Sequence, residues 1–110
     1  MQTYTLVQGD SAPQIAATIT RADNGAVVDM SGGVVRLKFR KKGTTTLLFT
    51  MTAADAGTNF ANGLAIFAFS TGDLATLSED FYEGEIEIEY DTGKKETVYE
   101  VLDFYVREDF

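Results

Sequence analysis

Four glutamates alternate with small or apolar residues along one stretch of this chain: Glu83, Glu85, Glu87 and Glu89. In an extended strand, Glu85 and Glu87 would lie on one face, about 7 Å apart. That separation suits the acid and base of an inverting glycosidase, which flank the scissile sugar bond. Any alternating strand with a polar face spaces its carboxylates in the same way, so the pattern indicates a solvated strand face rather than an active site.

Other residue types that carry chemistry are scarce. The sequence has no histidine and no cysteine, which excludes the usual general base, the thiol nucleophile and the imidazole or thiolate metal ligand. Glu89 and Asp91 with nearby loop carbonyls suggest a calcium site, but the ligand spacing of an EF-hand is absent. We therefore expect a non-enzymatic protein with no catalytic residue, no metal site and no cofactor.

The bulk composition is that of a globular protein. The chain has 110 residues, of which 45% are hydrophobic and 24% charged, and we expect one domain over residues 1–110. Its net charge of −8 at pH 7 would repel the phosphates of nucleic acid. No run approaches the roughly 20 apolar residues of a membrane helix. Neither nucleic acid nor a membrane is expected as a partner.

The acidic stretch belongs to the longest patterned segment, residues 81–106. Its first run places an apolar set opposite the glutamates: Tyr82, Gly84, Ile86, Ile88 and Tyr90. Residues 91–94, with sequence DTGK, predict a tight hairpin turn. The return run offers a second apolar set, with a bulge expected around Glu100 and Val101: Val98, Leu102, Phe104 and Val106.

The rest of the chain reads as further short strands separated by turns. Alternation predicts strands at 4–8, 14–20, 34–42 and 47–51, and a dense apolar run predicts a buried strand at 64–69. Residues 53–63 read as a long surface loop. Residues 70–73 resemble a helix-capping sequence, which predicts one short helical turn near 71–77 with Leu74 and Leu77 on the core. The expected fold is an all-β, antiparallel two-sheet sandwich of seven to eight short strands.

The basic residues are also grouped, with Arg36, Lys38 and Arg40 on one face of the 34–42 strand. Two interpretations stay open. The basic and acidic strands neighbour each other in one sheet and pair internally, or each meets a complementary strand of another subunit.

Two further stretches are candidates for contact with a partner. The opening strand, with Tyr4 and Leu6, is short enough to be a sheet edge that adds to a neighbour's sheet. Phe110 lies beyond the last strand, where it would rest on a neighbour or fray. Most aromatic residues fall in inward strand phases, and the exceptions suggest a platform for sugars: Phe60, Tyr99, Tyr105 and Phe110.

Several segments together resemble a known group of proteins. They are LVQGDSAPQIAATIT (6–20), NGAVVDMSGGVVRLKFRKKG (24–43), NGLAIFAFSTGDLATL (62–77), YEGEIEIEYDTGKKETV (82–98) and FYVRED (104–109). In turn chemistry and alternation the chain resembles small bacteriophage virion domains, of the kind found at the N-terminus of siphophage upper baseplate proteins. The 53–63 loop departs from that pattern.

The resemblance implies an immunoglobulin-like β-sandwich in the virion, made in the host bacterial cytoplasm. It implies many symmetric copies, homo- or hetero-oligomeric, that contact other virion proteins in the tail, baseplate or an adaptor. A capsid decoration protein is the alternative within the same class. A carbohydrate-binding module for host adsorption is the alternative from another class.

Overall fold

The structure is a computed structural model, and it describes residues 3–9, 14–21, 23–54, 57–69, 72–97 and 101–108. Its strands are β1 (Thr3–Val7), β2 (Gln14–Thr18), β3 (Val34–Lys41), β4 (Leu47–Thr52), β5 (Leu64–Ala68), β6 (Asp80–Glu89), β7 (Lys95–Thr97) and β8 (Leu102–Arg107). Two 3-10 turns accompany them, η1 (Phe60–Asn62) and η2 (Leu74–Thr76). In this described part of the chain, no helix is long and apolar enough to cross a membrane.

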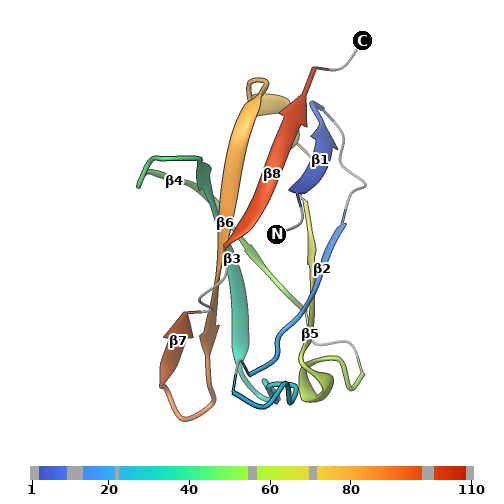
Figure 1. Cartoon of the computed structure of the whole chain (residues 1–110), viewed down its shortest axis with the longest axis vertical. Helices are drawn as coiled ribbons and strands as arrows, with labels where there is room; N and C mark the ends of the chain where they lie inside the picture. The colour runs from blue at the N-terminus through green and yellow to red at the C-terminus, as the bar shows by residue number, and fades with distance from the viewer. Residues whose placement is uncertain are drawn as a thin grey trace.

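The larger layer is a six-stranded sheet in the order β1-β8-β6-β3-β4, with β7 paired to the far end of β6. Figure 1 shows β6 and β3 at its centre and β1 beside β8. All of its strand pairs are antiparallel except one. β1 runs parallel to β8, with Leu6 beside Val106, which departs from the wholly antiparallel sandwich that we predicted.

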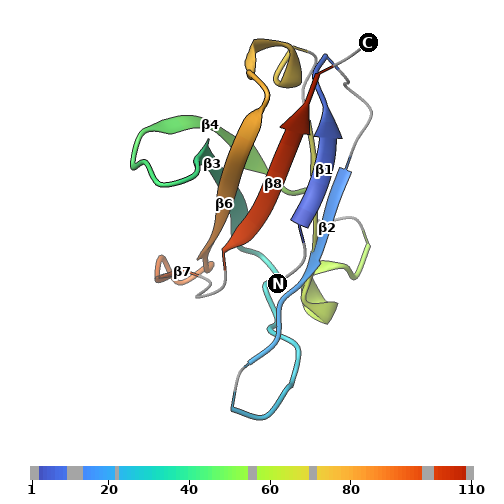
Figure 2. The same cartoon turned by 45° about the horizontal axis from the view of Figure 1, so that its top comes forward.

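The smaller layer is the antiparallel pair β2-β5. Figure 1 shows both strands to the right of β3 and β6, and Figure 2 shows β2 to the right of β1 and β8. The inward residues of both layers are buried between them, as alternation predicts: Ile15 and Phe67 from the pair, with Val35, Leu37, Phe39, Ile86, Ile88, Phe104 and Val106 from the large sheet. The same alternation sends the polar side chains of β3 and β6 to the outer face.

Phe39 is the centre of the core. Its ring lies 4.8 Å from that of Phe49, 5.0 Å from Phe104 and 5.4 Å from Tyr82, measured between ring centroids. Gly84 makes this packing possible, because a Cβ there would stand 2.6 Å from Leu37 Cδ1 and 3.0 Å from Phe104 Cε2. The glycine in the acidic strand therefore serves the core beneath it.

A tyrosine near the start of β6 confirms the type of sandwich. The Tyr82 hydroxyl donates a hydrogen bond to the carbonyl oxygen of Ser78 over 2.8 Å, four residues upstream and just before the strand. This is the tyrosine corner of immunoglobulin-like domains, which sits at the same turn between the two sheets. Together with the strand order, it identifies the fold as an all-β, immunoglobulin-like sandwich.

The turns are partly as predicted. The 91–94 hairpin is confirmed by the Tyr90 N–H bonded to Lys94 O at 2.8 Å, with Gly93 at a φ of 86°. Leu74 and Leu77 are buried around η2, while residues 70 and 71 of the capping sequence lie outside the described residues. The bulge was expected around Glu100 and Val101, and residues 98–100 also lie outside the described residues.

The interpretation of 53–63 as a surface loop was wrong for Phe60. That side chain is 2% exposed at the start of η1, and its carbonyl accepts the N–H of Met30 at 2.9 Å. The ring was one of the candidates for a sugar platform, and its burial removes it. The residues around Phe60 in the sequence are small and polar. A single apolar residue among them shows no periodicity, so the sequence does not indicate that this side chain is buried.

Candidate functional site: an ion-paired face and open sheet edges

The basic and acidic strands are neighbours in one sheet. β3 and β6 pair so that Arg36 lies beside Glu87, Lys38 beside Glu85 and Arg40 beside Glu83. These side chains, with Glu89, form the charged face of the large sheet. The first of the two interpretations, internal pairing, is therefore what the structure has.

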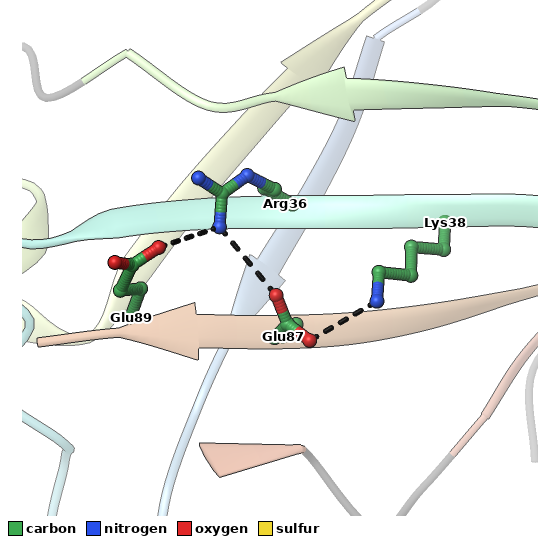
Figure 3. Close-up of polar contacts among 4 residues, drawn as sticks. All are labelled: Arg36, Lys38, Glu87 and Glu89. Carbon is green, nitrogen blue, oxygen red and sulfur yellow. Dashed lines mark hydrogen bonds and ion pairs between the residues drawn. The ribbon is translucent and has the colours of Figure 1, made fainter. Parts of the chain in front are cut away.

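Ion pairs run along this face from strand to strand (Figure 3). Arg36 Nη1 lies 3.1 Å from Glu89 Oε1 and 3.4 Å from Glu87 Oε1. Lys38 Nζ reaches the other oxygen of Glu87 at 3.0 Å. Further along, Arg40 Nε lies 3.2 Å from Glu83 Oε1. Arg36 and Arg40 thus each contact the glutamate directly opposite on β6, whereas Lys38 contacts Glu87, which lies diagonally across from it.

The electrostatics of Glu87 follow from this geometry. Its side chain is 17% exposed, and the hydrogen bond from Lys38 lowers the pKa of its carboxyl, with the charges of Lys38, Lys95 and Arg36 acting in the same direction. A general acid needs the opposite shift, because it must stay protonated near neutral pH. Glu87 therefore lacks the raised pKa that a general acid requires.

Glu85 differs from the other three glutamates. Its carboxylate has no hydrogen bond or ion pair within the described residues, although Lys38 is its cross-strand neighbour. It lies with Lys38, Arg40 and Leu47 around a shallow pocket of about 200 Å³. In the part of the chain that the structure describes, no group of three or more acidic side chains could hold a metal ion.

The predicted edge strand exists, but Tyr4 and Leu6 do not form its contact surface. Leu6 is 4% exposed in the core, and the Tyr4 ring stacks on Phe104 with centroids 5.5 Å apart. The N–H of Gln8 bonds to Arg107 O at 2.9 Å. Backbone N–H and C=O groups alternate in direction along a strand. Those of Leu6 and Tyr4 therefore also point to β8, while those of Thr5 and Val7 point to the free edge.

An aromatic pair lies on the outer face next to that edge, and our prediction found only half of it. Phe81 is 53% exposed, and its ring lies 4.9 Å from that of Tyr105 on the outer face. Tyr105 donates its hydroxyl to Glu79 over 2.8 Å, which raises the pKa of the phenol. Phe81 starts the acidic strand in its polar phase, so alternation could have identified it. Tyr99 and Phe110 lie outside the described residues.

Comparisons with known proteins add little to the geometry. No protein-family model matches the sequence, and no curated protein matches it. One similar solved structure is that of murine CRIg, with 11% sequence identity and a TM-score of 0.46, covering 96% of this chain and 92% of that chain. At this identity and score, the likeness says nothing about what this chain binds.

Proposed function

We propose that this chain is a non-enzymatic structural protein of a bacteriophage particle. It assembles in many symmetric copies with other virion proteins of the tail, baseplate or an adaptor, after synthesis in the host cytoplasm. The sequence resemblance supplies the viral context. The geometry supports an assembly role, because the surface features of the described residues are open strand edges and paired charges rather than a catalytic pocket.

One observation carries the assembly role, namely the free edge of β1. Thr5 is exposed on an end strand of the sheet, and the backbone groups of Thr5 and Val7 point away from β8, the partner strand of β1 among the described residues. An unpaired edge of this kind accepts a strand from a neighbour, with main-chain hydrogen bonds supplying affinity and side-chain phase supplying register.

The test is incorporation of the tagged chain into purified particles. Thr5→Pro removes the edge N–H and should reduce the copies per particle at least severalfold, while Thr5→Ala keeps the N–H and serves as the control. The wild-type chain should sediment with particles at a fixed ratio to the major capsid or tail protein. A chain that stays in the soluble fraction would overturn the virion assignment. A ratio fixed to the capsid protein would favour the decoration role.

The outer-face pair of Phe81 and half-buried Tyr105 favours a second candidate, a carbohydrate-binding module for host adsorption. Aromatic faces stack on sugar rings, and Glu79 beside Tyr105 offers a hydrogen-bond acceptor. A glycan array probed with the isolated chain tests this function. Binding that Tyr105→Ala and Phe81→Ala both abolish would support it, and an array without bound glycans would reject it.

A further inference from the structure

The outer face of the β2-β5 pair carries no ionisable side chain. Its residues are Gln14, Ala16 and Thr18 on β2, beside Ala68, Ile66 and Leu64 on β5. In a chain of net charge −8, a neutral sheet face of small side chains is a distinct surface. A backbone can approach it closely without stripping water from a charge.

The edge of β5 is open on the side away from β2. Ile19 N–H bonds to Gly63 O across the pair at 2.8 Å, whereas Leu64 N–H turns away and bonds to Asn59 O at 2.8 Å. Because backbone direction alternates along a strand, Ile66 and Ala68 also point their N–H and C=O groups away from β2. No partner strand takes up those groups within the described residues.

A groove runs along this open edge. It has a volume of about 340 Å³, and Ile66 and Ala68 line it together with Gln14, Thr52, Ala54 and Asn59. Thr52 is the last residue of β4 and Ala54 lies just after it, and β4 pairs only with β3 among the described residues. The groove therefore lies where the two layers of the sandwich approach each other, and one of its walls is the open edge of β5.

We propose that this groove binds a short, extended segment of another protein, which adds to β5 as a third strand. Two residues with one N–H and one C=O each allow about four backbone hydrogen bonds. About four backbone hydrogen bonds suit the binding of a short peptide segment. A stable dimer needs a larger contact, in which each partner buries roughly 800 Å² of surface. Repulsion between acidic copies also disfavours a second copy of this chain. The bound segment is accordingly uncharged or basic, with small side chains toward Ala68.

The β4 edge is a weaker acceptor for such a segment. The register of β3 and β4 shifts between Phe39 and Arg40, which leaves Leu48 without a partner on β3. Bulges of this kind twist an edge and block further pairing. β5 pairs without a shift along its whole length.

The probe is a displayed library of random ten-residue peptides, selected on the purified chain. Selected peptides should bind Ala68→Pro roughly tenfold more weakly, since the ring removes the edge N–H and obstructs the added strand. Ala16→Pro is the matched control. It changes an exposed alanine of the same pair whose N–H faces the opposite edge, and it should bind as the wild type does.

A second measurement needs no variant. Bound peptide should slow amide exchange at Ile66 and Ala68 in the wild-type chain. Four outcomes would each overturn the proposal. They are equal affinity of the peptides for Ala68→Pro and wild type, a peptide footprint elsewhere on the chain, a library without binders, and self-association through β5. Its failure is distinguishable from failure of the proposed function. Particles that incorporate wild type and Ala68→Pro equally would retain the virion role and reject the groove.

Discussion

The two outer faces of the sandwich differ in charge and in whether the backbone beside them has free hydrogen-bonding groups. The outer face of the large sheet carries alternating lysine, arginine and glutamate side chains, and most of these pair with one another. The outer face of β2-β5 carries none, and the backbone beside it is open. A prominent charged pattern can thus be satisfied within the chain, while a featureless sequence such as LAIFA borders a surface that still lacks a partner.

The largest expected effect is on stability, and it tests the hydrophobic core between the two sheets. Phe39→Ala should lower the free energy of unfolding by about 3–5 kcal/mol, because a fully buried ring leaves a cavity among Phe49, Tyr82 and Phe104. Phe81→Ala, on the outer face, should cost under about 0.5 kcal/mol. Urea unfolding followed by circular dichroism measures both, and equal losses would contradict the assignment of Phe81 to the surface.

The next effect tests whether the charged face is internal. Changing Arg36, Lys38 and Arg40 together to glutamate places like charges beside Glu83, Glu85 and Glu87, and should cost about 1–3 kcal/mol. Adding Glu83→Lys and Glu87→Lys should recover part of that loss, since opposite charges again face each other. If the triple variant is as stable as wild type but is missing from particles, the cations belong to a partner contact instead.

Ala68→Pro should weaken binding at the β5 edge without lowering stability more than its control Ala16→Pro does. Ala68→Pro and Ala16→Pro both change exposed residues whose N–H lies outside the β2-β5 ladder, where proline is tolerated. Their free energies of unfolding should match each other within about 0.5 kcal/mol. A much larger loss for Ala68→Pro would mean that its N–H is already bonded in the free chain.

The smallest effect is a pH dependence at Glu87. Because Lys38 lowers the pKa of this carboxyl in the folded chain, the pair stabilises the fold above the ordinary glutamate value of 4.5. That contribution is lost as the pH falls through the lowered folded-state pKa. Glu87→Gln should therefore flatten the decline in melting temperature on the acid side. An unchanged slope would show that the ion pair is absent in solution.

The sequence predicted what depends on local alternation. The pairing of the two charged strands agrees with one of the two interpretations of their complementary charges. The inward phase of Ile86 and Ile88 and the 91–94 turn follow from residues close together in the chain. The parallel pairing of β1 and the burial of Phe60 do not, because each depends on a partner distant in sequence. Alternation also identifies which side chains face inward, but not which backbone groups lack a neighbour.

The site was predictable to the same extent. The charged stripe of Arg36, Lys38 and Arg40 was visible in the sequence from charge and spacing, but whether it pairs within the chain or with a partner was left open until the structure showed the internal ion pairs. Thr5 was overlooked in favour of Leu6, because the sequence does not show on which side of β1 its partner strand β8 lies, and that decides which N–H groups point to the free edge. The groove at Ile66 and Ala68 has no sequence signal, as alanine and isoleucine there look like any other strand residues.

Residue-resolved amide hydrogen exchange of the free chain tests the central claim most directly. An open edge at β5 predicts rapid exchange at Ile66 and Ala68, with strong protection at Ala65 and Phe67, whose N–H groups bond to β2. Lys38 and Arg36, inside the paired sheet, should also be protected. Strong protection at Ile66 and Ala68 in the monomeric chain would contradict the account, because that edge would already be covered.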